Sequence, residues 1–491
     1  MDDQRPQEDL PGEGLLRSEA HSGQVTNNVF GILLHLAAWA VVAALVLVVM
    51  TLTLLASSIM PAPQMPPLPV NQELTGRLLI GTKNLMGDES SSMLLLQAEP
   101  LRTGSFEEQL AYTILLSELS GPEVGLEDLE RLNELSEEEH PRSEESNELA
   151  EIVGALLFAS ASGERADVLP EEQRAQLNRS LGIYGAYLHA RATMDKAELA
   201  QLDAETSRGA IFVIAIAGWF LLSFFSGVVV LVVLAIMVLM RMLPLKISID
   251  GVPSRSIYIE TFAVWLVLQL VLQVFAGLFA PPSAGTERML LFSMIAMFAS
   301  LLALFWPIIR GVPFARMRQE CGLYGGRTWY LEIFAGFATY AAALPILLVG
   351  LGLSFLVGII VKEVFGEVPP PAHPIQEAIS GSVVGIILIY LLVCVAAPIV
   401  EEIIFRGVLY RYLRDGSRRM GWFLSFVLSA LVSSFIFAAI HPQGLTFIPV
   451  LGALAVAFCI GREWRGSLIA PTIAHAINNG VVMTLNVALL A

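Results

Sequence analysis

Long apolar runs separated by short polar segments dominate this chain. A helix needs about 20 apolar residues to cross roughly 30 Å of hydrocarbon, and runs of about that length recur along the sequence. They cover 29–60, 209–240, 257–280, 288–309, 329–361, 378–410, 421–440, 446–461 and 467–490. The pattern predicts an all-α, polytopic membrane protein with about nine transmembrane helices.

The segment between the first and second runs has a different pattern, typical of a soluble helical insert. Leucines at helical spacing alternate with charged residues, and helix start and stop signals recur. These signals are a capping box at Ser105 to Glu108, a stop at Gly121, a start at Ser146, a stop at Gly163, a first-turn proline at Pro170 and a cap formed by Asp195 with Glu198. We expect paired helices in this insert.

Composition divides the N-terminal part of the chain into four segments. The tail, 1–28, is polar and predicted to be disordered, and 29–60 is a retained transmembrane anchor. An acidic extramembrane helical domain follows at 61–208 and begins with a Pro-rich linker that should be extended. Additional transmembrane helices occupy 209–317.

The net charge of −16 is confined to the acidic domain. Residues 61–208 contain 27 acidic and 11 basic residues, whereas the rest of the chain has 18 of each. The sequence therefore lacks a basic nucleic-acid-binding surface, and we expect no nucleic-acid partner. The acidic domain is predicted to bind a protein partner or to space the membrane parts. The three cysteines lie outside this domain and predict no disulfide framework: Cys321, Cys394 and Cys459.

Basic residues predict the orientation in the membrane. Four loops rich in arginine or lysine are each separated from the next by two predicted spans: 241–255, 310–327, 411–419 and 462–465. All four therefore lie on one face, which the positive-inside rule assigns to the cytoplasm. The acidic domain, one span upstream of Arg241, is predicted to lie outside.

An acidic pair and an arginine close the apolar run 378–410. Ionisable groups inside a membrane segment cost about 2.5–3.5 kcal/mol each on insertion scales, so Glu401, Glu402 and Arg406 predict a functional site. Glu402 and Arg406 have the i,i+4 spacing of a helical ion pair, which would hold Glu402 ionised and structural. Glu401, about 100° away on the helix, remains the candidate general base. Pro398 is expected to bend the helix beside that carboxylate.

Two later apolar runs carry histidines. His441 follows Phe437 by four residues and precedes Pro442, which predicts that the helix ends at His441. His475 and Asn479 share one face of the last span, where an imidazole and an amide can donate hydrogen bonds to one developing oxyanion. A carboxylate pair, two histidines and an amide on three apolar segments predict a hydrolytic site buried in a membrane.

These motifs resemble those of a known family. Glu-Glu-x-x-x-Arg at 401–406, Phe-x-x-x-His at 437–441 and His-x-x-x-Asn at 475–479 look, in this order, like the CAAX protease and bacteriocin-processing (CPBP, Abi) family of intramembrane endopeptidases, which includes the Ras-converting enzyme. The start of that family's core also has a counterpart, in Gly322, Leu323, Trp329, Glu332 and Gly336. The resemblance covers about 318–491.

The resemblance implies a catalytic transmembrane core at 318–491 and a role for each motif residue. Glu401 acts with His441 to activate a water, and His475 and Asn479 form the oxyanion hole. The site opens toward the cytoplasm. Supporting roles fall to Glu402, Arg406 and Phe437.

We therefore expect an intramembrane endopeptidase that hydrolyses a peptide bond in a membrane-associated protein or lipid-associated peptide. We expect it to reside as a multi-pass protein in the lipid bilayer of a bacterial plasma membrane. The alternative is a non-proteolytic membrane scaffold of the same family, acting in immunity or signalling. Two cofactor hypotheses remain: direct activation of water without a cofactor, or a zinc ion held by Glu401, His441 and His475 with one open position.

Two further acidic residues lie a few positions inside predicted spans. Glu260 and Glu332 each follow a basic loop, so we expect them to snorkel toward it or to pair with Arg255 and Arg327. This interpretation gives neither carboxylate a part in catalysis.

Overall fold

The computed structural model describes residues 31–51, 70–134, 143–240, 255–281, 285–326, 328–365 and 382–490. Within these ranges every regular element is helical, which confirms the predicted all-α class. The chain forms two compact units. The predicted tail, the Pro-rich linker and several basic loop residues lie outside the described ranges: 1–28, 61–69, Arg241, Lys246 and Arg327.

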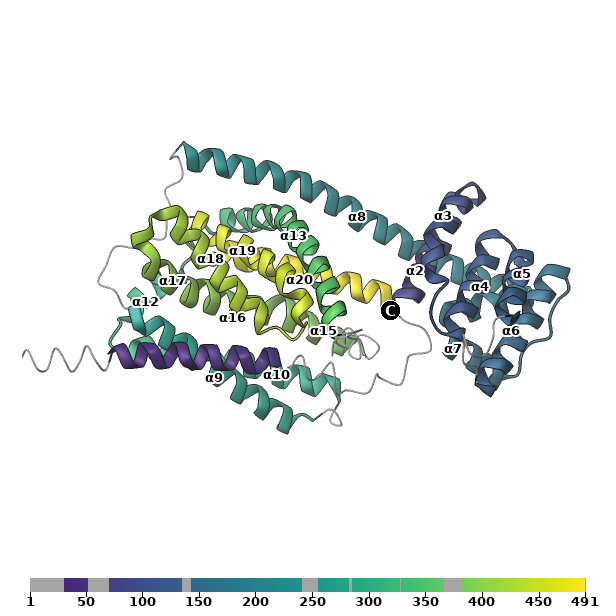
Figure 1. Cartoon of the computed structure of the whole chain (residues 1–491), viewed down its shortest axis with the longest axis horizontal. Helices are drawn as coiled ribbons and strands as arrows, with labels where there is room; N and C mark the ends of the chain where they lie inside the picture. Colours follow the sequence, from purple (N-terminus) through teal and green to yellow (C-terminus); the bar gives the residue numbers. More distant parts are fainter. Residues whose placement is uncertain are drawn as a thin grey trace, which may run out of the picture. The chain divides into compact units, whose positions relative to one another are not determined.

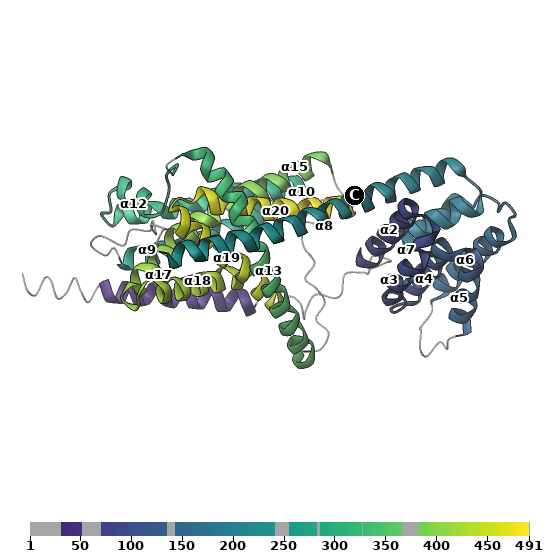
Figure 2. The same cartoon turned by 90° about the horizontal axis from the view of Figure 1, so that it is seen from above.

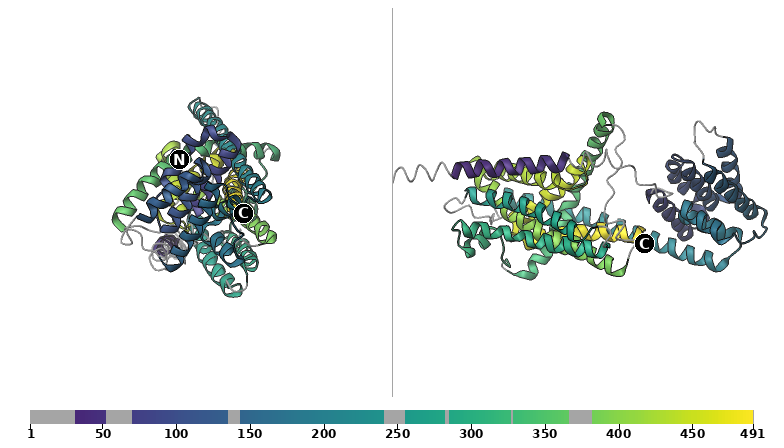
Figure 3. Two further views of the ribbon diagram at one scale, coloured as in Figure 1. Left: turned by 90° about the vertical axis from the view of Figure 1, so that its right-hand side faces the viewer. Right: turned by 90° about the horizontal axis from the view of Figure 1, so that it is seen from below.

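The acidic unit, Met60–Leu222 with Met483–Ala491, is a set of short helices around one apolar core. Figure 3 shows these helices in blue. Helix α4 lies at the centre, with nearly all its side chains buried against its neighbours. The helices are α2 (Val70–Met86), α3 (Ser91–Ala98), α4 (Phe106–Ser120), α5 (Pro122–Glu134), α6 (Glu144–Ser162), α7 (Glu171–Ala192) and the first part of α8 (Lys196–Leu239).

Polar caps define the helix ends of the acidic unit largely as predicted. Ser105 accepts a hydrogen bond from the Glu108 N–H at 3.3 Å, and Asp195 accepts from the Glu198 N–H at 3.0 Å. The predicted start at Ser146 is wrong, because the N-cap of α6 is Ser143, which accepts from the Ser146 N–H at 3.0 Å. The earlier cap places two glutamates in the first turn, where the helix dipole favours negative charge. Pro170 is the N-cap of α7, one residue before the predicted first-turn position.

The membrane unit, Met1–Ile59 with Ser223–Val482, contains the long apolar helices. Among the described residues, eight helices are long and apolar enough to cross a membrane, so the protein is a polytopic helical membrane protein. They are Gly31–Thr51, Lys196–Leu239, Ser256–Phe279, Thr286–Ile309, Trp329–Val364, Val383–Met420, Trp422–Ala439 and Leu445–Arg465. The last predicted span is helix α20 (Ile469–Leu490), which carries His475 and Asn479.

The helices that build the membrane unit are numbered as in Figure 1. Upstream of 366 they are the end of α8, α9 (Arg255–Phe279), α10 (Thr286–Ser300), η4 (Leu301–Leu304), α11 (Phe305–Ile309), α12 (Phe314–Glu320) and α13 (Trp329–Phe365). Downstream they are α15 (Val383–Leu391), η5 (Leu392–Ala396), α16 (Ala397–Glu401), η6 (Glu402–Leu409), α17 (Tyr410–Ser417), η7 (Arg418–Met420), α18 (Trp422–Ala439), η8 (Leu445–Phe447), α19 (Ile448–Arg465) and α20.

Helix α19 packs between α13 and α18, and Figure 2 shows it near both. Small residues allow the close approach of α13 and α19. A Cβ on Gly350 would lie 2.5 Å from the Ala453 Cβ, and one on Gly461 would lie 2.7 Å from the Thr339 methyl carbon. Glycines at such contacts let helix backbones pack closely in lipid, where van der Waals contact replaces the hydrophobic effect.

Helices outside the predicted catalytic core contribute to the packing around it. On α9, Phe262 and Trp265 are buried with their rings edge-on to Phe405, at centroid distances of 5.4 and 5.7 Å. From the first helix, Gly31–Thr51, the Trp39 indole N–H donates to the Tyr412 hydroxyl at 2.8 Å. The apolar core of the membrane unit is therefore continuous with these upstream helices.

The two carboxylates expected to pair with nearby arginines have more distant partners. Glu260 accepts hydrogen bonds from Arg310 at 3.1 Å and from Trp306 at 3.0 Å, whereas the side chain of Arg255 lies outside the described residues. Glu332 forms a bidentate ion pair with Arg465, at 2.6 and 3.1 Å. Both carboxylates are buried, and each joins helices far apart in sequence, which satisfies a charge that would be costly if left alone.

Candidate active site

The helix that carries the acidic pair departs from α geometry on both sides of it. Two π-helical stretches, η5 and η6, flank the five-residue helix α16 that ends at Glu401. The Ala397 N–H donates to the carbonyl of Leu392, five residues back, instead of to Val393. The next residue, Pro398, has no N–H, so it cannot donate to the Val393 carbonyl either. The distortion of the helix expected beside Pro398 is therefore a π turn. Such turns are frequent at functional sites.

Asn479 supplies the missing donor. Its side-chain amide donates to the Val393 carbonyl at 2.9 Å, which joins α20 to the π turn. A carbonyl at membrane depth needs a partner, so this bond has a structural role that the sequence did not indicate. The amide nitrogen has a second hydrogen, which is the one that the predicted oxyanion role would use.

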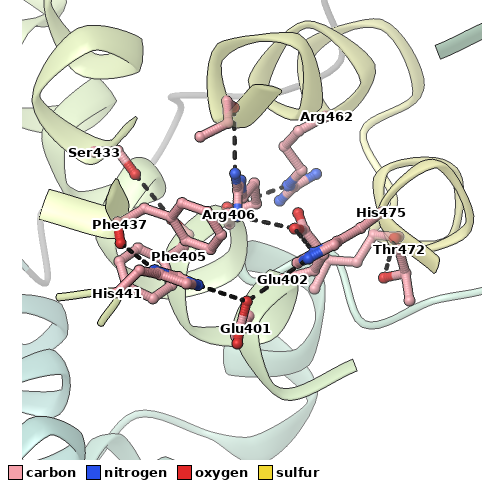
Figure 4. A network of polar contacts seen from close by, with 12 residues as sticks. Glu401, Glu402, Phe405, Arg406, Ser433, Phe437, His441, Arg462, Thr472 and His475 are labelled. Carbon is pink, nitrogen blue, oxygen red and sulfur yellow. Dashed lines mark hydrogen bonds and ion pairs between the residues drawn. The ribbon is translucent and has the colours of Figure 1, made fainter. Parts of the chain in front are cut away.

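Glu401 lies between the two predicted histidines (Figure 4). Its Oε2 atom is 3.8 Å from Nε2 of His441 and 3.8 Å from Nε2 of His475. The Glu401 and His441 side chains remain 14% and 20% exposed, so the protein does not enclose them completely. A separation of 3.8 Å is too long for a direct hydrogen bond, whereas a water about 2.8 Å from each of two atoms spans it.

The second carboxylate is enclosed and holds two other groups. Glu402 is fully buried, and its Oε1 accepts from Arg406 Nη1 at 2.8 Å, which is the predicted i,i+4 ion pair. The same oxygen lies 2.9 Å from Nδ1 of His475. Glu402 therefore orients a histidine as well as pairing with the arginine, and no local sequence spacing signals that contact.

Hydrogen bonds at Nδ1 fix which nitrogen of each histidine faces Glu401. His441 Nδ1 is 2.5 Å from the Phe437 carbonyl oxygen, and His475 Nδ1 faces the Glu402 carboxylate. Both partners are acceptors, so both Nδ1 atoms carry a proton and Nε2 has a lone pair in each neutral imidazole. The site thus presents a carboxylate oxygen and two imidazole lone pairs to the same small space.

Aromatic rings enclose the arginine of the motif. The Arg406 guanidinium lies 4.7 Å from the Phe437 ring centroid and 5.1 Å from that of Phe458, and its Nη2 donates to the Ala455 carbonyl at 3.2 Å. The Phe437 ring also contacts His441, at a centroid distance of 4.3 Å. Phe437, predicted to support the site, lies in it, whereas Phe458 was missed because it belongs to none of the three motifs.

A mainly apolar cavity borders the same helices. It has a volume of about 450 Å³ and is lined in part by residues from α16, η6 and α20. The lining also includes the segment that precedes α13, which contains Leu323 and Tyr324. The helix segments that carry the acidic pair and His475 therefore also face an apolar space.

The zinc alternative can be tested against the geometry of its three expected ligands. In a tetrahedral site with bonds of about 2.0–2.1 Å, ligand atoms lie about 3.3 Å apart. Both separations from the Glu401 oxygen are 3.8 Å. Across the described ranges, no group of three or more His, Cys, Asp or Glu side chains is arranged to hold a metal ion. As placed, the two measured separations are wider than in an ideal tetrahedral site, and zinc binding stays a prediction.

Comparisons with known proteins match the part of the chain that contains this site. Residues 383–481 match the family model described as type II CAAX prenyl endopeptidase Rce1-like. Over 131 residues, 26% of this chain and 50% of the relative, the sequence is 28% identical to the membrane-embedded CAAX protease MroQ of Staphylococcus aureus. Over 194 residues, 35% of this chain and 87% of the relative, it is 27% identical to an uncharacterized 24.3 kDa protein of Escherichia coli.

The match to MroQ spans half of that protein's length, and no solved structure matches this chain. The matched region of the family model contains the acidic pair, both histidines and Asn479. This segment, 383–481, is therefore similar to the CAAX proteases, which are membrane proteins.

Proposed function

We propose that this protein is an intramembrane endopeptidase that hydrolyses a peptide bond in a membrane-associated polypeptide. One observation carries the proposal: Glu401 lies 3.8 Å from the Nε2 atoms of two histidines that come from different segments. The buried ion pair beside them would hold this arrangement in place. The match to the family model supports an endopeptidase-type activity, and the bacterial relatives support a bacterial plasma membrane.

In the proposed mechanism, a water binds between Glu401 and His441. It donates one hydrogen bond to the carboxylate and one to the imidazole lone pair, so its own lone pairs are free to attack. Glu401 takes the proton as the water oxygen adds to the scissile carbonyl carbon. The resulting tetrahedral oxyanion is stabilised by donors, and the C–N bond breaks as Glu401 returns its proton to the amide nitrogen. The products are a carboxylate and an amine.

His475 and Asn479 are the proposed donors to the oxyanion. Because Nδ1 of His475 already donates to Glu402, its Nε2 donates only when the ring is an imidazolium. The Glu402 carboxylate orients the ring for that bond by accepting from Nδ1. Glu402 thus has a proposed role in catalysis, exerted through His475 without contact with the substrate.

The test is cleavage of membrane-inserted peptides by the purified full chain in liposomes. We expect ¹⁸O from labelled water in the new carboxyl terminus, because the proposed nucleophile is water. Glu401→Gln should abolish the cleavage, with Glu363→Gln, a glutamate outside the site, as the control. If an active wild-type preparation and the Glu401→Gln protein cleave equally fast, the proposal is wrong.

A further inference from the structure

Phe458 is a buried aromatic residue that contacts two groups of the site at once. It lies on α19 and is fully buried. Its ring stacks on the His475 imidazole with a centroid distance of 4.9 Å and an interplanar angle of 24°. The Arg406 guanidinium lies 5.1 Å from the same ring centroid. These two side chains are the pair that converges on Oε1 of Glu402.

The contacts of Phe458 differ in kind from those of Phe437. The Phe437 ring meets His475 edge-on, at 6.0 Å and 75°, whereas Phe458 presents its face. An aromatic face carries negative electrostatic potential and attracts cations, most strongly where water is excluded. Ala455, one turn earlier on α19, accepts a hydrogen bond from Arg406 through its carbonyl. One face of α19 therefore fixes the arginine by both contacts.

We propose that Phe458 is a positioning residue for His475. Its ring holds the imidazole in the plane that directs Nδ1 to Glu402 and Nε2 to Glu401. Its π face also holds the Arg406 guanidinium, the other group that donates to Oε1 of Glu402. The consequence for turnover rests on the proposed function, whereas the effect on the imidazole does not. Phe458 acts through His475, so its loss should lower kcat and leave KM unchanged.

The first test compares two leucine substitutions in the full chain. Phe458→Leu removes the ring beside His475, and Phe426→Leu removes a ring that stacks on Trp422 at 5.9 Å, elsewhere in the unit. We expect kcat to fall about 5- to 30-fold for Phe458→Leu, from the usual strength of a buried cation–π contact. Phe426→Leu should leave kcat unchanged. A folded Phe458→Leu protein with wild-type kcat would overturn the proposal.

The second test keeps the size of the ring nearly constant. Phenylalanines with increasing fluorine content, incorporated at position 458, progressively weaken the negative face. We expect kcat to fall stepwise with fluorine content at constant KM. Side-chain ¹⁵N NMR gives a readout without turnover, with the His475 signals assigned by their loss in His475→Gln. We expect those signals to move stepwise as well.

The two readouts separate the two hypotheses. If the wild-type protein cleaves no peptide but the ¹⁵N signals move along the fluorine series, the proposed function fails and the positioning role holds. If cleavage occurs and neither kcat nor the ¹⁵N signals respond to fluorine, Phe458 only fills space and this inference is wrong.

Discussion

The acidic pair gives the sharpest prediction, because its two members should fail in different ways. Glu401→Gln removes a charge from a side chain that is partly exposed and makes no contact shorter than 3.8 Å with either histidine. Its cost in stability should be below about 1 kcal/mol, since the amide keeps the shape. Its cost in turnover should be about 10²–10⁴-fold, which is the usual contribution of a general base.

For Glu402→Gln, in contrast, the loss of stability should be large. It leaves Arg406, which is 1% exposed, without its carboxylate. Breaking a buried ion pair on one side costs about 3–5 kcal/mol. We expect the lower end, about 3 kcal/mol, because Arg406 keeps the Ala455 carbonyl and the two aromatic faces. The variant should unfold earlier in detergent and also lose turnover, since His475 loses its acceptor.

The assay is thermal unfolding by a thiol-reactive or scattering probe, followed by peptide cleavage at a temperature where each protein is folded. A matched double variant, Glu402→Gln with Arg406→Met, should recover much of the stability of Glu402→Gln, because no unpaired charge remains. A Glu402→Gln protein as stable as the wild type would refute the reasoning about the ion pair. Full activity in Glu401→Gln would refute the assignment of the base.

Three further outcomes are expected. Asn479→Ala should lower kcat about 10²–10³-fold with little change in KM, and a change in KM alone would contradict the oxyanion role. Burial lowers the pKa of His189 in the acidic unit, so stability should be full above the unfolded-state pKa of about 6.5 and fall as pH drops below it. The unfolding midpoint should therefore decrease from pH 7.5 to 5.5, and less so in His189→Gln; equal slopes would contradict this. In a background without native cysteines, an impermeant maleimide should label Glu148→Cys but not Arg419→Cys from outside intact cells, and the reverse pattern would refute the predicted orientation.

Contacts between residues close in sequence could be predicted, and contacts between residues far apart in sequence could not. The ion pair of Glu402 with Arg406 follows from i,i+4 spacing, and the cap at Ser105 follows from its own first turn. The partner of Glu332 is Arg465, 133 residues away. Nothing local distinguishes that arginine from others in the basic loops, and Arg327, the predicted partner, lies outside the described residues.

The candidate site divides in the same way. The three motifs indicated the residues that the structure brings together around Glu401, because hydrolytic chemistry in a membrane needs rare polar groups that are easy to find. The contact between Glu402 and His475, and the stacking of Phe458, arise from packing between helices. A phenylalanine in an apolar helix has no distinguishing sequence signal, so only the structure separates this one from the rest of the core.

The π turns explain how separate helices are held in register with the acidic pair. At η5 the π turn leaves the Val393 carbonyl without a backbone donor, and the Asn479 side chain donates to it instead. Asn479 is one helical turn from His475 on α20. At η6 the Phe405 carbonyl accepts from the Tyr410 N–H, five residues on, and from Ser433 at 3.5 Å. Ser433 is one turn before Phe437 on α18, the helix that leads to His441. The π-helical backbone therefore accepts hydrogen bonds from both segments that carry the histidines. An unbroken α-helix satisfies its carbonyls internally and would form such bonds less readily.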